Sequence, residues 1–232
     1  MSTIDRLIDL DKSLLLFLNG SDSSFLDGFF WTLTGTVTWI PFFLCMVYVV
    51  LKNNDFRKAL LLIGLTILLV VASDQFSSGL CKAYFHRLRP SHYPSLYYYV
   101  ELVNGYRGGL YGFISSHASN TFAVSVFFSL VFKNKWTSVV LFSWALLSSY
   151  SRIYLGLHYP ADIFAGAVAG TILGLFFYYI YLFAAKNLYS NRNFYSSAYT
   201  SSGYLIDDLL VLQCVYSFTL LYLVFAGMLF SA

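Results

Sequence analysis

Charged residues are scarce in this sequence, and that scarcity excludes most soluble proteins. Asp, Glu, Lys and Arg make up 11% of the 232 residues, whereas soluble domains carry about 25%. Hydrophobic residues make up 58%, and the mean hydropathy is +0.66. These values indicate an integral membrane protein. The net charge of +3 is too small to indicate a nucleic-acid partner.

Cysteine is also rare, and its placement predicts no metal site. Cys45, Cys81 and Cys214 have neither Cys-x-x-Cys spacing nor a histidine at the spacing of metal ligands. We interpret them as small apolar residues. A cleavable signal peptide is not expected, because residues 1–12 mix acidic and basic side chains and lead to no small-residue cleavage site.

Long apolar runs are what the sequence has in abundance. Runs of about 20 apolar residues predict membrane helices. We expect these helices at about 29–51, 58–81, 114–132, 137–156, 160–185 and 208–230. The predicted fold class is therefore all-α, a polytopic membrane bundle of six helices that occupies residues 29–232 as one domain.

Residues 1–28 form a separate N-terminal segment in this prediction. Within the first 18 residues, leucines and isoleucines alternate with charged residues at a spacing that suits an amphipathic helix lying in the membrane interface. The alternative is a ragged extension of the first membrane helix.

Basic residues outside the apolar runs suggest an orientation. The connections 52–58, 133–136 and 186–207 fall on one side of a six-helix bundle, and each carries Lys or Arg. The positive-inside rule favours the cytoplasm for that side. Both termini and the long loop 83–113 then face outward.

Three short polar segments interrupt the apolar sequence, and all fall on that outer side. They are Lys82–Pro90, Ser115–His117 and Ser151–Asp162, and each lies at the end of an apolar run. Ionisable groups in membrane segments are costly and are functional candidates by default. We expect the topology to bring the three segments together at one membrane face.

The residue types in these segments are typical of a site that catalyses phosphoryl transfer. Lys82, Arg89 and Arg152 around a helix N-terminus would make a phosphate cradle. Two histidines supply a nucleophile and an acid, and an aspartate can orient one of them. We expect no third histidine, second carboxylate or cysteine near the cluster, so no metal or cofactor is predicted. The pattern indicates reaction through a phosphohistidine.

The three motifs together resemble the type-2 phosphatidic acid phosphatase superfamily, which includes membrane lipid phosphatases and soluble vanadium haloperoxidases. They read Lys-x6-Arg-Pro, Ser-x-His and Ser-Arg-x5-His-x3-Asp, in the family's order and spacing. The resemblance covers about residues 60–182. It implies that His158 attacks phosphorus, that Asp162 holds His158, and that His117 protonates the leaving oxygen.

The same resemblance implies the phosphate-binding residues. These are Lys82, Arg89, Ser115, Ser116 and Arg152. The middle motif departs from the usual Pro-Ser-Gly-His, because Ile114 and Ser116 stand where the family has Pro and Gly. Ser116 adds a side chain beside the phosphate while its backbone N–H stays available.

Other polar residues receive structural interpretations. We expect His86 and His92 to form hydrogen bonds at the interface. Arg87 and Arg107 are interpreted as cations that contact lipid headgroups. Asp74, inside the second apolar run, is assigned a structural role in preference to one that supports the site.

The predicted function is a metal-independent hydrolase of the inner membrane whose site faces the periplasm. The run 104–117 resembles small Gram-negative envelope phosphatases, and lipid A phosphate is the leading substrate. Undecaprenyl pyrophosphate and phosphatidylglycerol phosphate are alternatives within the class. A lipid or phosphate transporter is the alternative of another class. A transporter would be expected to carry its charged residues near the bilayer midplane, whereas here they lie at the ends of the apolar runs. The apolar runs argue against a soluble haloperoxidase.

Overall fold

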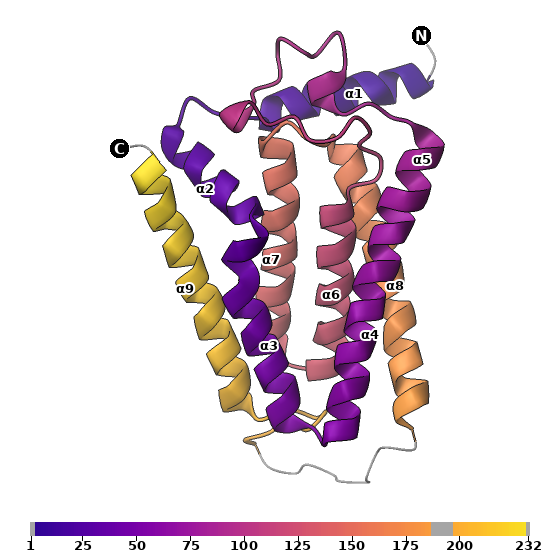
Figure 1. The fold of residues 1–232 in the computed structure, drawn as a ribbon, viewed down its shortest axis with the longest axis vertical. Coiled ribbons are helices and arrows are strands. Elements are labelled where there is room, and N and C mark those ends of the chain that lie inside the picture. Colours follow the sequence, from indigo (N-terminus) through magenta and orange to yellow (C-terminus); the bar gives the residue numbers. More distant parts are fainter. Residues whose placement is uncertain (1–2, 187–196, 231–232) are drawn as a thin grey trace.

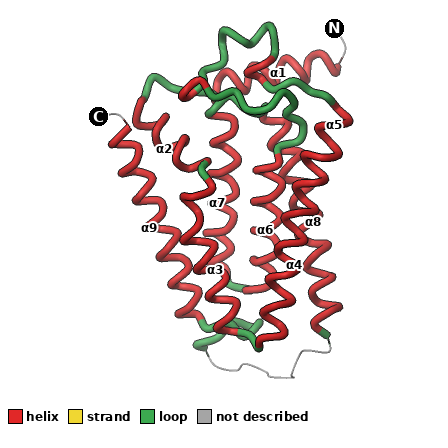
Figure 2. Tube along the Cα trace, viewed as in Figure 1, coloured by secondary structure: helices red, strands yellow, loops and turns green. Residues whose placement is uncertain are grey.

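A computed structural model describes residues 3–186 and 197–230, which form a bundle of long helices (Figure 1). Within these residues the regular structure is helical, apart from isolated β-bridges that join Leu88 to Tyr111 and Tyr199 to Leu205 (Figure 2). Helix α1 (Thr3–Leu18) lies across one end of the bundle, which we call the α1 end. Arg192, part of the predicted basic connection 186–207, lies outside the described residues.

The helices confirm the prediction of a membrane protein but not the predicted number of spans. In the described residues, four helical stretches are long and apolar enough to cross a membrane, namely Thr36–Asn53, Phe56–Phe85, Pro160–Ala185 and Ile206–Phe230. Helix α6 (Ser116–Phe132) is apolar but shorter, and α7 (Lys135–Tyr154) carries several serines. Both helices pack on several neighbouring helices. Much of their surface therefore contacts protein instead of lipid and need not be apolar along its whole length. The count of six spans stays a prediction.

The first predicted span differs from the structure. Residues 29–51 belong to two helices, α2 (Ser24–Thr34) and α3 (Ile40–Asn53), joined by the 3₁₀ turn η1 (Thr36–Trp39). Gly35 leaves helical geometry at φ −70°, ψ 129°. The side chains of Thr38 and Trp39 donate hydrogen bonds to the last carbonyls of α2, at 2.7 and 2.8 Å. These bonds stabilise the break, because they replace helical donors that α2 lost.

The second predicted span also ends differently. Helix α4 (Phe56–Asp74) passes into a π-helical turn, η2 (Gln75–Cys81), and then into the short α5 (Lys82–Phe85). The chain leaves the helix at His86, whose φ is 47°. Arg89, which precedes Pro90, has extended backbone. A π-turn inserts an extra residue into the helix, so it rotates Lys82 relative to α4.

Helices α6 and α8 (Pro160–Ala185) pack closely because α8 presents glycines to α6. A Cβ at Gly170 would lie 2.2 Å from the carbonyl oxygen of Ser119, and one at Gly174 would lie 2.7 Å from that of Ala123. Small residues allow such close backbone approach between membrane helices. This contact fixes the start of α6 beside the start of α8. Helix α9 (Ile206–Phe230) packs on α2 and α3 at the edge of the bundle.

A turn separates α1 from α2. The Asn19 side chain donates to the carbonyls of Glu101 (3.0 Å) and Tyr154 (2.7 Å) and accepts from the Glu101 backbone N–H at 2.8 Å. These bonds hold the turn against the 83–113 loop and the end of α7. Helix α1 is therefore not an extension of the first span.

Candidate active site

The ends of α5 and α7 and the starts of α6 and α8 all lie at the α1 end of the bundle (Figure 1). The structure thus brings the three polar segments together, as the topology predicted. Ser115 caps α6, with its side chain 3.4 Å from the N–H of Ala118. Pro160 occupies the first turn of α8, where its missing N–H costs nothing.

Lys82 lies against the start of α6. Its Nζ donates to Ser116 Oγ at 2.7 Å and to Ser78 Oγ at 3.1 Å. The two serine hydroxyls are themselves 2.7 Å apart. The hydroxyl that replaces the family's glycine therefore holds the predicted phosphate-binding ammonium. Asp74 accepts from Ser78 at 3.3 Å, so it contacts this network without touching Lys82 directly.

Two buried arginines complete the positive charge of the site. Arg89 donates to the carbonyls of Tyr111 (3.2 Å) and Leu157 (3.3 Å), and Arg152 donates to the hydroxyl of Thr34. In the described part of the chain, neither arginine forms an ion pair, and Arg152 Nε has no hydrogen-bond partner. Buried cations without counter-charges are costly. The arrangement therefore favours binding of an anion.

His158 is buried beside Asp162. Its side chain is 2% exposed, and its Nδ1 lies 3.6 Å from Asp162 Oδ2. Burial lowers the pKa of His158 well below its ordinary value, and the positive charges of Arg89 and Arg152 lower it further. The imidazole is therefore neutral at neutral pH, as a nucleophile must be.

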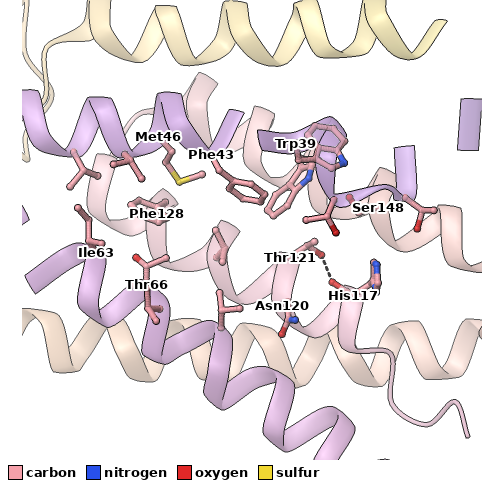
Figure 3. A pocket seen from close by; sticks show the side chains of 18 of the residues that line it. Trp39, Phe43, Met46, Ile63, Thr66, His117, Asn120, Thr121, Phe128 and Ser148 are labelled. Atoms are coloured by element: carbon pink, nitrogen blue, oxygen red, sulfur yellow. Dashed lines mark hydrogen bonds between the residues drawn. The ribbon is translucent and has the colours of Figure 1, made fainter. Parts of the chain in front are cut away.

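His117 lines an apolar pocket of about 550 Å³ (Figure 3). Its exposed side chain is on the first turn of α6 and within electrostatic range of Arg152 and His158. The pocket is lined by residues of α3, α4, α6 and α7, such as Met46, Ile63, Phe128 and Ser148.

Sequence reasoning missed three residues that contact this group. Arg87, expected to contact lipid headgroups, instead donates to Asp162 Oδ1 and Asp11 Oδ2, both at 2.7 Å. The expectation of no second carboxylate near the cluster is also wrong, because Asp11 reaches it from α1. These pairings join distant parts of the chain, so spacing along the sequence carries no signal for them.

Gly112 is the third residue that was missed. A Cβ on Gly112 would lie 3.2 Å from Asp162 Oδ2, 3.2 Å from Arg89 Cγ and 3.6 Å from His158 Nδ1. Its place in the glycine-rich run 105–112 is a signal that backbone approaches the site. His86 packs edge-on against Tyr111, with ring centroids 4.7 Å apart.

Comparison with protein families decides what kind of site this is. The family model described as "PAP2 superfamily" matches residues 59–186. The chain belongs to the PAP2 superfamily. This match contains all eight predicted site residues of the PAP2 chain. No solved structure matches the chain.

Individual relatives of the PAP2 chain agree with this assignment. It is similar to a lipid A 4'-phosphatase of Porphyromonas gingivalis, with 38% identity over 78% of this chain and 77% of the relative. A lipid A 4'-phosphatase of Bacteroides thetaiotaomicron is 40% identical over 76% of this chain and 79% of the relative. An undecaprenyl-diphosphatase of Bacillus subtilis is 33% identical over only 28% of this chain and 33% of that protein.

The PAP2 chain is therefore a membrane lipid phosphatase, a phosphoric-ester hydrolase. This finding supports the predicted enzyme over the transporter.

Proposed function

We propose that this PAP2 phosphatase removes a phosphate monoester from lipid A at the periplasmic face of the inner membrane. The observation that carries the proposal is the similarity to lipid A 4'-phosphatases over more than three quarters of the chain. The undecaprenyl-diphosphatase resemblance covers a much shorter stretch. The substrate's charge suits a site that carries three cations and two histidines.

In this proposal the phosphate binds where the positive charges converge. Lys82, Arg89 and Arg152 hold its non-bridging oxygens, and the unpartnered Nε of Arg152 is free to do so in the part of the chain that the structure describes. The first N–H groups of α6, beside Ser115 and Ser116, add donors and the positive end of the helix dipole. These groups stabilise the charge that develops in the transition state.

Nucleophilic attack then falls to His158. Its Nδ1 faces Asp162, so Nε2 is the nitrogen left for phosphorus. A new N–P bond forms while the bond between phosphorus and the ester oxygen breaks, and His117 gives a proton to that oxygen. In the second half of the reaction, His117 takes a proton from water, which attacks phosphorus and releases inorganic phosphate from His158. The step needs no metal, because the protein's own cations supply the charge.

The apolar pocket supports a lipid substrate. Val47 of α3 and Ile67 of α4 line it and are 39% and 59% exposed. An acyl chain that enters between these helices reaches His117 without crossing water. The pocket's position thus suits a phosphate whose carrier stays in the membrane.

The membrane arrangement is part of the proposal. Six spans cross the inner membrane within residues 29–232, with the family core at 60–182, and the N-terminal segment 1–28 rests in the outer interface. Ile4, Leu7 and Phe17 on α1 are 68%, 61% and 84% exposed, which suits contact with lipid. The start of α1 and the end of α9 lie toward the end of the bundle that holds the site (Figure 1).

A substrate panel tests the proposal. Purified protein should release phosphate from lipid A with higher kcat/KM than from undecaprenyl pyrophosphate or phosphatidylglycerol phosphate, and His158→Ala should abolish the release. Orthovanadate, which mimics pentacoordinate phosphorus, should inhibit. A preference for undecaprenyl pyrophosphate would contradict the substrate assignment, and an active His158→Ala variant would contradict the mechanism.

A further inference from the structure

Arg87 forms ion pairs with two carboxylates that lie on different helices, Asp11 on α1 and Asp162 on α8. One guanidinium nitrogen donates to Asp162 Oδ1 on α8, and another donates to Asp11 Oδ2 on α1, each at 2.7 Å. The guanidinium plane also lies over the ring of Tyr159, 4.1 Å from its centroid. With a carboxylate on each of two nitrogens and an aromatic ring on its face, Arg87 has a fixed position.

The contact matters because Asp162 is buried. Its side chain is 0% exposed, and its other oxygen, Oδ2, accepts from the Tyr159 backbone N–H at 3.0 Å while facing His158 Nδ1. Arg87 is thus the cation that pairs directly with this carboxylate among the residues that the structure describes. Its bond to Oδ1 also fixes the rotation of the carboxylate, and thereby the direction in which Oδ2 points.

Asp11 holds the other side of Arg87. Its Oδ1 accepts from the backbone N–H of Ala161 at 2.9 Å, in the first turn of α8. Asp11 therefore binds both the start of the helix that carries Asp162 and the arginine that orients Asp162. Its side chain is only 10% exposed, although it belongs to the helix at the edge of the molecule.

We propose that Arg87 is a positioning residue for the Asp162–His158 pair, and that α1, through Asp11, is part of the active-site scaffold. The inference rests on the proposed phosphohistidine mechanism. Arg87 acts through Asp162, because its two terminal nitrogens each donate to a carboxylate, one of them that of Asp162.

This role predicts a specific kinetic pattern. Arg87→Gln should lower kcat by about 10- to 100-fold, the range typical for groups that orient a reactive residue, while KM changes by less than about twofold. Arg87→Lys keeps the charge but reaches a single carboxylate, so it should recover part of kcat. Asp11→Asn should lower kcat less than Arg87→Gln, since Arg87 can still bind Asp162.

The pairing itself is tested by combining the changes. In the Arg87→Gln background, Asp11→Asn should have little further effect on kcat, because residues that act as a unit are non-additive. Asp9→Asn is the matched control, since Asp9 lies on the same helix, has a 55% exposed side chain and pairs only with Lys12 in the described residues. It should leave kcat at the wild-type value. Thermal unfolding in detergent checks that each variant folds.

Three results would overturn the inference. The first is a kcat for Arg87→Gln equal to that of Asp9→Asn. The second is a raised KM at unchanged kcat, which would make Arg87 a substrate-binding residue. The third, which applies if Arg87→Gln does not fold, is a wild-type kcat in both Arg87→Lys and Asp11→Asn. His158→Ala is measured alongside: if it is active, the proposed mechanism fails, whereas a fully active Arg87→Gln beside an inactive His158→Ala contradicts only the role of Arg87.

Discussion

At the scale of single residues, the site holds buried arginines that form no ion pair within the residues that the structure describes. Arg89 and Arg152 are 9% and 6% exposed and are held by carbonyl and hydroxyl oxygens. His158 is buried among them. This arrangement keeps the imidazole neutral and makes an anionic ligand the natural partner of the arginines.

The low pKa of His158 predicts how activity depends on pH. Burial and the nearby arginines lower this pKa below its ordinary value of 6.5, so protonation, which blocks attack, begins only at lower pH. After correction for titration of the substrate phosphate, kcat/KM should stay constant as the pH falls through 6.5. A loss of activity centred at or above that pH and assigned to His158 would contradict this prediction.

Gly112 predicts a loss of activity from one added methyl group. A Cβ at Gly112 would lie 3.2 Å from both Asp162 Oδ2 and Arg89 Cγ, so these groups must move by a few tenths of an ångström. Gly112→Ala should lower kcat by about tenfold or more, because catalysis is sensitive to small misplacements. Gly109→Ala, in the same loop and with open space around its Cβ, is the control and should resemble wild type.

Most residues of the site could be predicted from the sequence, whereas the residues that hold them in place could not. Ser115, His117 and Pro160 lie at helix starts because capping and proline preferences are local. Asp11 and Arg87 were missed because their role depends on a contact between α1 and α8, which no local pattern encodes. Ser116 departs visibly from the family motif, but its hydrogen bond to Lys82 depends on how the chain packs in three dimensions.

At the scale of elements, two helices that carry the site are positioned by the contact between α6 and α8. The glycines of α8 allow backbone to approach backbone, which sets His117 relative to His158. Apolar length predicted the bounds of α6 and α8 closely. It did not predict the break at Gly35 or the π-turn at 75–81, because both depend on side-chain and backbone hydrogen bonds within an apolar run.

The glycine contact predicts a loss of stability. Gly170→Ala places a Cβ against the backbone of Ser119 and Ala123, which cannot move aside as a side chain can. The variant should unfold more easily by about 1–3 kcal/mol, the usual cost of overpacking, seen as a lower Tm in detergent. Gly64→Ala has open space around its Cβ and should match or exceed the wild-type Tm. Equal Tm values for all three proteins would contradict the role of this contact.

At the scale of the whole molecule, the site, α1 and the long loop share one end of the bundle, and the short connections from α3 to α4 and from α6 to α7 lie at the other (Figure 2). The positive-inside rule predicts that the end opposite the site faces the cytoplasm, and this orientation stays a prediction. Apolar composition was enough to predict a membrane protein, whereas the number of crossings depends on α6 and α7, whose packing within the bundle relaxes the need for a long apolar run.

Sidedness follows as a labelling prediction. In a variant without the three native cysteines, Tyr98→Cys places a thiol at an 89% exposed position of the long loop. A membrane-impermeant maleimide should label it once the outer membrane is permeabilised. Lys135→Cys, exposed at the opposite end, should react only after the inner membrane is opened. The reverse pattern would place the site in the cytoplasm.

The most direct test of the central claim is to trap the phosphoenzyme. Lipid A labelled in its phosphate should transfer the label to wild-type protein in an acid-labile, base-stable bond, and peptide mapping should locate it at His158. The His158→Ala variant should carry no label. Label on another residue, or phosphate release by His158→Ala at the wild-type rate, would contradict the account.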